Sequence, residues 1–193
     1  MNYNRLIAIT GGIGSGKSVV SHLLEVLGYR VYNCDSRAKA LMEEDSEIVR
    51  SLTERFGPHI YEQGKLCRQA LAERVFHDTD AREFVNSVVH KAVKEDMLRC
   101  SNEPAKGDVL FVETAIPFVS GIDKMSYQLW QVQAPQEVRI KRAMSRSQLS
   151  YDDVVGRIEA QRDECRITEH TVLINNDNVQ AIIPQVIHAL SSI

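Results

Sequence analysis

The run Gly-Gly-Ile-Gly-Ser-Gly-Lys-Ser at residues 11–18 constrains this chain more than any other feature. It lies between an apolar run at 6–10 and an amphipathic stretch at 19–27, the strand, loop and helix context of a phosphate-binding loop. Glycines let the backbone curl so that successive N–H groups point at an anion, and the following helix presents its positive end. The run therefore predicts an α/β fold whose first strand leads into a nucleoside triphosphate site.

Two side chains at the end of this loop have predictable roles. Lys17 is placed to reach the β and γ phosphates of the nucleotide. Ser18 supplies the hydroxyl that Mg²⁺ bound to those phosphates accepts as a ligand. We therefore expect Mg²⁺ as the cofactor.

Composition indicates one compact enzyme and excludes several other classes. The 193 residues are 44% hydrophobic and 25% charged, which is ordinary for a globular domain. A net charge of −3 gives no global attraction to nucleic acid or to an anionic membrane. No apolar stretch approaches a membrane span, and no secretory leader precedes the first strand, so we expect a cytoplasmic protein. Widely spaced cysteines disfavour a zinc or redox motif: Cys34, Cys67, Cys100 and Cys165.

Hydrophobic patterning predicts a parallel sheet with two inserted segments. Further strands are expected at 29–33, 109–113, 129–132 and 171–174. The segment 36–107 is mainly helical in pattern, with a small hairpin or an extended loop at 60–66. Two helices are predicted between the last strands, one from Pro135 toward Arg146 and one from Ser150 to about Arg162. The C-terminal helix is expected to be capped by Asn178 and kinked or divided at Pro184.

A phosphate loop alone does not separate kinases from switch GTPases or motor ATPases. The Asn-Lys-x-Asp element of guanine specificity is missing, and a D-x-x-G match at 153–156 falls inside a predicted helix. About 190 residues without a long second domain argue against a motor. The economical hypothesis is a small-molecule kinase, and a nucleotide-dependent switch or binding module is the alternative from another class.

A kinase needs a carboxylate to orient or deprotonate the accepting hydroxyl. Asp35 is the leading candidate, because it follows a strand that we expect beside the phosphate loop. Glu113 ends the next strand and could help to hold Mg²⁺, or could be a structural charge at a strand end.

Cations must balance the charge of the phosphoryl group in transfer. They cluster late in the chain, either as a solvated helix face or as a lid that closes over triphosphate, at Arg139, Lys141, Arg142, Arg146, Arg157, Arg162 and Arg166. Arg142 and Arg146 are four residues apart on one predicted helix, so both can point into the same site.

Taken together, these residues resemble the dephospho-CoA kinase family over nearly the whole chain. The resemblance is carried by an ordered set of motifs: the segment 9–18, the Asp35 region, Leu66-x-Arg68-x-x-Leu71 with Phe76, Ile116-Pro117, Lys141-Arg142, Arg146, Gln161 and Asn175-Asn176. The family phosphorylates the ribose 3′-hydroxyl of dephospho-CoA with ATP in the last step of coenzyme A synthesis. The resemblance therefore implies ATP and dephospho-CoA as substrates, with no nucleic-acid or membrane partner.

The resemblance also implies an architecture and residue roles. The architecture is a P-loop NTPase three-layer sandwich with a parallel sheet, comprising a core (1–35, 108–138 and 171–193), a helical acceptor-binding insertion (36–107) and a lid (139–170). The resemblance assigns catalysis to Asp35, Lys17 and Arg142. It assigns ATP binding to Gly14, Ser15, Gly16, Lys17, Ser18, Val19 and Arg146. Acceptor binding is placed at Leu66, Arg68 and His90.

The chain departs from the family pattern at four places. The usual Asp-x-Asp after the second strand is Asn33-Cys34-Asp35, so only the second carboxylate is kept. Val19 replaces a threonine near the α phosphate, Lys91 replaces the proline after His90, and the usual Glu is missing after Ile116-Pro117. These changes concern acceptor binding more than the type of reaction.

Overall fold

A computed structural model describes residues 5–147 and 149–193. Its main sheet has five parallel strands: β1 (Arg5–Thr10), β2 (Arg30–Asn33), β5 (Val109–Glu113), β6 (Gln128–Gln133) and β7 (Thr171–Asn175). The helices are α1 (Lys17–Val26), α2 (Cys34–Glu44), α3 (Ser46–Phe56), α4 (Arg68–Val75), α5 (Thr79–Ser101), α6 (Gln136–Ser147), α7 (Tyr151–Ala160) and α8 (Ile182–Leu190). Short 3₁₀ turns are η1 (Pro58–Ile60), η2 (Lys106–Asp108), η3 (Asp123–Met125) and η4 (Arg162–Cys165). In the described part of the chain, no helix has the length and apolar character needed to cross a membrane.

The chain divides into two compact units. One unit, called here the core unit, comprises residues 1–33 and 101–193, and the other, the helical unit, comprises residues 34–100. The predicted division into core, insertion and lid stays a prediction, and residues 1–4 of that core and Gln148 of that lid lie outside the described residues.

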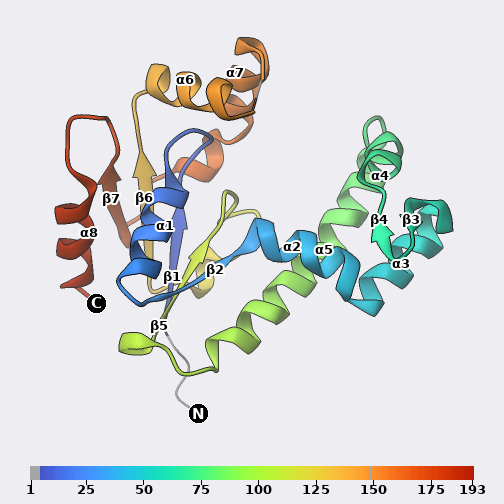
Figure 1. Cartoon of the computed structure of the whole chain (residues 1–193), viewed down its shortest axis with the longest axis horizontal. Helices are drawn as coiled ribbons and strands as arrows, with labels where there is room; N and C mark the ends of the chain where they lie inside the picture. Colours follow the sequence, from blue (N-terminus) through green and yellow to red (C-terminus); the bar gives the residue numbers. More distant parts are fainter. Residues whose placement is uncertain (1–4, 148) are drawn as a thin grey trace. The chain divides into compact units, whose positions relative to one another are not determined.

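The strand order of the core unit is β2-β5-β1-β6-β7, and every neighbouring pair is parallel. The predicted α/β class with a parallel sheet is thus confirmed. The prediction that Asp35 follows a strand beside the phosphate loop is wrong, because β5 lies between β1 and β2 (Figure 1). Hydrophobic pattern identifies strands but carries no information on which strands pair, since all central parallel strands are uniformly apolar.

Both faces of the sheet are buried, as expected for parallel strands that helices cover. On one face, Ile7, Phe111 and Trp130 pack with the apolar sides of α1 and α8. The alternate residues Ala8 and Val112 are also buried, although they point to the opposite face. This continuous apolar character fixes β1 firmly, and β1 delivers the phosphate loop at its carboxyl end.

Helix α1 ends with a Schellman motif, which confirms that Gly28 terminates it. The Gly28 N–H donates to the Glu25 carbonyl and the Tyr29 N–H donates to the Leu24 carbonyl, both at 2.9 Å. Gly28 has φ +86°, a left-handed conformation that costs other residues free energy. The turn directs the chain into β2.

The C-terminal helix departs from the prediction. Helix α8 begins at Ile182 with Ala181 at its N-cap, so Asn178 does not cap it. Instead, the Asp177 carboxylate accepts the N–H groups of Val179 and Gln180 and forms a turn before the helix. Pro184 lies in the first turn of α8, where its missing N–H has no intrahelical partner to lose, so it neither kinks nor divides the helix.

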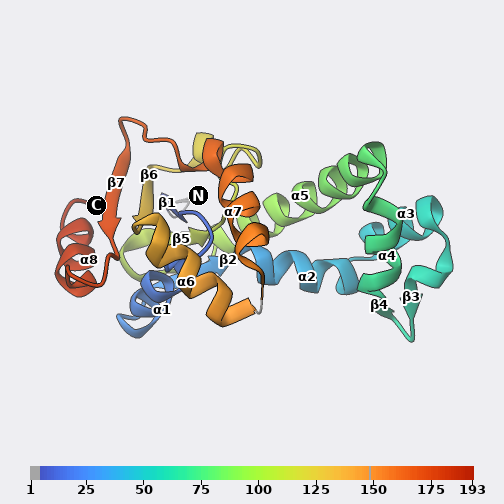
Figure 2. The same ribbon diagram turned by 90° about the horizontal axis from the view of Figure 1, so that it is seen from above.

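The helical unit is built from α2 to α5 and the hairpin β3 (Tyr61–Glu62) and β4 (Lys65–Leu66). The hairpin confirms the prediction for 60–66. Figure 2 shows α3, α4 and the hairpin gathered together, near the end of α2 and the start of α5. Its most completely buried side chains are Ile48, Leu52, Ile60 and Met97.

Two glycine-to-alanine substitutions should have opposite effects on stability. Gly28→Ala forces a side chain into the left-handed region and should lower the free energy of unfolding by roughly 1–2 kcal/mol. Gly156→Ala, inside α7 with open space around the new methyl, should raise it by about 0.5–1 kcal/mol. Urea unfolding of both variants checks this, and equal signs would contradict the assigned backbone conformations.

Candidate active site in the core unit

The phosphate loop connects β1 to α1 and has the backbone that the sequence predicts. Gly16 is the N-cap of α1 with φ +97°, and Lys17 and Ser18 are the first residues of the helix. A Cβ at Gly16 would lie 2.0 Å from the Asn176 amide nitrogen, so this position has no room for a side chain. The predicted ATP-binding residues from Gly14 to Val19 therefore share one loop and the first helical turn, where N–H groups favour an anion.

Lys17 folds back over its own loop. Its ammonium Nζ donates to the Gly11 carbonyl at 2.6 Å. This contact keeps the cation beside the backbone of the loop.

Arg142 and Asn176 hold the carbonyl groups of the phosphate loop. The Asn176 Nδ2 donates to the Ser15 carbonyl at 2.8 Å. Arg142 Nη1 donates to the Asn176 carbonyl at 3.0 Å and lies 3.5 Å from the carbonyls of Gly14 and Ser15. These bonds occupy carbonyl groups of the loop and so hold its backbone in place.

A second set of contacts comes from the segment predicted as a lid. Arg139 Nε donates to the Ile13 carbonyl at 3.0 Å, and Gln161 Oε1 accepts the Ile13 N–H at 2.7 Å. The Ile13 side chain packs into a small apolar cluster with Ile140 and Val154 of α6 and α7. In Figure 1 these helices lie beyond the carboxyl ends of β1 and β6.

Sequence reasoning gave no individual role to Arg139, Gln161 or Asn176. The sequence did contain partial indications, since Arg139 precedes Arg142 by three residues on one helix face. Gln161 and Asn176 were noted only as part of the resemblance. Their contacts with the loop are long-range and have no local sequence pattern.

Glu113 ends β5 and pairs with Asn33, the last residue of β2. The two residues are in register, and Asn33 Nδ2 donates to Glu113 Oε2 at 2.9 Å. Asn33 thus meets a carboxylate across the sheet, at the position where the family resemblance leads one to expect an aspartate. Two adjacent carboxylates would repel each other, whereas the Asn33 amide donates a hydrogen bond to the Glu113 carboxylate.

The oxygens of Ser18 and Glu113 fit the chemistry of Mg²⁺, which prefers hard oxygen ligands and usually keeps several waters. Ser18 is exposed in the first turn of α1, and Glu113 is half-buried at the end of the neighbouring strand. Both residues belong to the core unit. Their role as ligands stays a prediction.

Arg142 and Arg146 line one cavity of the core unit, with a volume of about 610 Å³. The structure therefore brings these two predicted lid residues together, as their spacing indicates. The remaining lining residues are Glu137, Val138, Lys141, Ser145 and Asn178.

Asp35 belongs to the helical unit, as the second residue of α2, and its side chain is exposed. Two of the predicted acceptor residues, Leu66 and Arg68, line a cavity of about 260 Å³ in the same unit. His90 lies on α5 and is not among the residues that line this cavity. The roles of these residues stay predictions.

The parallel sheet, the strand order and the phosphate loop at the end of β1 together define a P-loop kinase. Among solved structures, a shikimate kinase from Bacteroides thetaiotaomicron shares this fold with a TM-score of 0.53 at 14% identity, covering 97% of each chain. Residues 5–181 match the model of the dephospho-CoA kinase family, to which the chain therefore belongs.

Individual relatives agree with this assignment. The dephospho-CoA kinase of Porphyromonas gingivalis is 38% identical, over 97% of this chain and 93% of its own length. That of Bacteroides fragilis is 36% identical, over 96% of this chain and 91% of its own. A crystal structure of a Thermus thermophilus protein is similar with a TM-score of 0.78 at 30% identity, covering 98% of this chain and 96% of that one.

Removing the Asn176 side chain should weaken nucleotide binding. Asn176→Ala loses the bond to the Ser15 carbonyl, and we expect the Kd of MgATP to rise about tenfold, the equivalent of one such hydrogen bond. Asn175→Ala is the matched control, because Asn175 Oδ1 accepts from Gln133 and its side chain bonds no loop atom. Isothermal titration calorimetry measures the Kd of MgATP for both variants. Equal affinities would show that the contact of Asn176 with the Ser15 carbonyl does not support nucleotide binding.

Stability should fall below neutral pH partly through His90. Burial lowers the pKa of His90 below its ordinary value of 6.5. The unfolded chain therefore binds a proton at His90 more readily than the folded chain does, so protonation favours unfolding. The contribution of His90 to the free energy of unfolding is complete above about pH 6.5 and is lost as the pH falls below it. In His90→Gln, the decrease in Tm between pH 7.5 and 5.5 should be smaller by about 1–3 °C.

The control for this pH effect is His22→Gln, since the His22 side chain is 78% exposed. Its Tm should decrease with acid as that of the unaltered chain does. If His90→Gln also leaves the decrease unchanged, the burial of His90 has no consequence for stability.

Proposed function

We propose that this protein transfers the γ-phosphoryl group of ATP to the ribose 3′-hydroxyl of dephospho-CoA, giving coenzyme A and ADP. The observation that carries the proposal is the match to dephospho-CoA kinases over nearly the full chain. Transfer is in line, with catalysis by positioning and by neutralisation of charge.

ATP binds with its β and γ phosphates in the phosphate loop. The N–H groups from Gly14 to Val19 and the Lys17 ammonium surround the phosphates. Arg142 supports the loop from its carbonyl side and, with Arg146, supplies positive charge near the triphosphate. The 610 Å³ cavity that these two arginines line is large enough for the nucleoside part of ATP.

Ser18 and Glu113 would hold Mg²⁺, Glu113 either directly or through water. When bound, the ion neutralises charge on the β and γ phosphates. Asn33 orients the Glu113 carboxylate by donating to its Oε2.

Asp35 orients the 3′-hydroxyl and accepts its proton as the phosphoryl group arrives. Its exposure at the start of α2 leaves the carboxylate accessible to a substrate. The chain keeps no carboxylate at position 33, so Asp35 is the one carboxylate of the family's Asp-x-Asp pair that remains.

The acceptor binds to the helical unit. Arg68 and Lys39 line its 260 Å³ cavity and suit the diphosphate of dephospho-CoA, while Met42, Leu66 and Leu71 suit its pantetheine arm. His90 lies within the same unit, on α5. Both substrates are small and water-soluble. The proposed function therefore needs neither a nucleic-acid nor a membrane partner, and it suits a cytoplasmic protein.

Acceptor profiling tests the proposed function. ADP release from MgATP should be stimulated strongly by dephospho-CoA, and weakly or not at all by adenosine, AMP or shikimate. Stimulation by one of the others alone would keep the kinase and overturn the substrate. Slow hydrolysis that no acceptor stimulates would favour a nucleotide-dependent switch.

Asp35→Asn should lower kcat by roughly 10² or more, because general-base assistance is lost while the shape of the site is kept. The Kd of MgATP should stay within about twofold. Asp80→Asn, an exposed aspartate in the first turn of α5 in the same unit, should leave kcat unchanged. Turnover by Asp35→Asn at the rate of the unaltered enzyme would remove Asp35 from the base role.

A further inference from the structure

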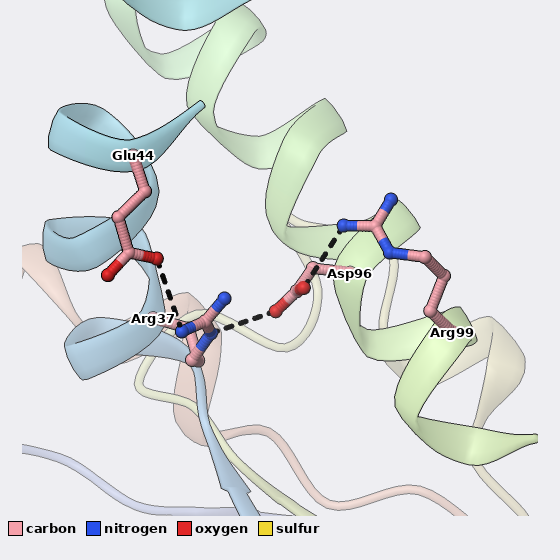
Figure 3. A network of polar contacts seen from close by, with 4 residues as sticks. All are labelled: Arg37, Glu44, Asp96 and Arg99. Atoms are coloured by element: carbon pink, nitrogen blue, oxygen red, sulfur yellow. Dashed lines mark hydrogen bonds and ion pairs between the residues drawn. The ribbon is translucent and has the colours of Figure 1, made fainter. Parts of the chain in front are cut away.

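A network of four charged side chains joins α2 to α5 within the helical unit (Figure 3). Arg37 Nε lies 2.9 Å from Asp96 Oδ2, and Arg99 Nη2 lies 3.1 Å from Asp96 Oδ1. On its other side, Arg37 Nη1 lies 3.7 Å from Glu44 Oε2. Asp96 therefore receives two guanidinium groups, and Arg37 connects the two helices.

The members of this network differ in burial, which decides the strength of each contact. The Asp96 side chain is only 11% exposed and that of Arg37 is 37% exposed, whereas Glu44 and Arg99 are 63% and 65% exposed. A buried carboxylate depends on its partners, because it has lost most of its water. Exposed pairs contribute little, so the contact of Asp96 with Arg37 dominates.

The contact of Arg37 with Asp96 lies close along the chain to the proposed base, Asp35. Arg37 follows Asp35 by two residues, in the first turn of α2. Asp96 lies in the last turns of α5, which ends at Ser101. The first turn of a helix lacks half of its backbone hydrogen bonds and depends on side chains to hold it.

We propose that Asp96 is a positioning residue for phosphoryl transfer. By holding Arg37, it fixes the first turn of α2 against α5 and thereby fixes the carboxylate of Asp35. The inference rests on the proposed role of Asp35 as the base. A displacement of about 1 Å at a reacting group can cost 10²-fold in rate, so a contact two residues away has a large effect without touching substrate.

Asp96→Asn tests this inference, because it keeps the shape of the side chain and removes its charge. We expect kcat to fall between about tenfold and 10²-fold, with the KM for ATP and the Kd of MgATP within about twofold. A role in stability alone would lower Tm and leave kcat unchanged at temperatures where the variant is folded. Steady-state kinetics well below the measured Tm separate the two.

Two substitutions in the same network serve as controls. Glu44→Gln removes the exposed partner of Arg37, and Arg99→Gln removes the exposed partner of Asp96. Both should leave kcat within about twofold. Arg37→Lys keeps the charge and loses the Nε contact, and like Asp96→Asn it should lower kcat. If Asp96→Asn fails to fold, the kcat of Arg37→Lys tests the positioning role instead.

A double-mutant cycle shows whether Asp96 acts through Asp35. In the Asp35→Asn background, adding Asp96→Asn should cause no further loss of kcat. A kcat unchanged by Asp96→Asn, or a loss of equal size in both backgrounds, would overturn the inference while the proposed function stands. Full turnover by Asp35→Asn alone would overturn the role of Asp35, and this inference with it.

Discussion

The site depends on hydrogen bonds that hold the phosphate loop from its carbonyl side. A short glycine-rich loop has no ladder of its own to fix its curvature, so other segments must supply the partners. Asn176 after β7 and Arg142 on α6 occupy the carbonyls of Ser15 and its neighbours. Arg139 donates to the Ile13 carbonyl, and Gln161 accepts the Ile13 N–H. The carbonyls engaged in this way are less able to repel an anion, and the first turn of α1 offers N–H groups that favour one.

The same contacts connect the loop to the helices that would cover it. Ile13 belongs to the apolar cluster of α6 and α7, and Arg142 also lines the 610 Å³ cavity. A movement of α6 would therefore disturb the phosphate loop, because Arg139 and Arg142 of this helix contact its carbonyls. The acceptor side follows a different design, since Asp35 stands on a helix of the separate helical unit and relies on the contact of Arg37 with Asp96. The proposed base thus depends on an ion pair between two helices, while the loop depends on hydrogen bonds from arginine, asparagine and glutamine side chains to its backbone.

Features with local causes could be predicted from the sequence. The Val109–Glu113 strand, the hairpin after Ile60 and the Ser150 cap of α7 follow from periodicity and turn chemistry, and all three are confirmed. Features that depend on distant residues could not. The position of β5 between β1 and β2 has no local pattern, nor does the contact of Asn176 with Ser15, which are 161 residues apart in the chain. The wrong prediction of a kink at Pro184 has a different origin. A proline is tolerated in the first turn of a helix, so the outcome depends on where α8 begins, and helix boundaries are poorly defined by sequence.

The product of the reaction reports directly which hydroxyl of the acceptor is phosphorylated. Purified protein would be incubated with MgATP and dephospho-CoA, and the product examined by phosphorus NMR with coupling to the ribose protons. The account predicts one new phosphomonoester, coupled to the proton at the ribose 3′ carbon and formed in equal amount to ADP. A phosphomonoester on another hydroxyl, or ADP formed without any phosphorylated acceptor, would contradict it.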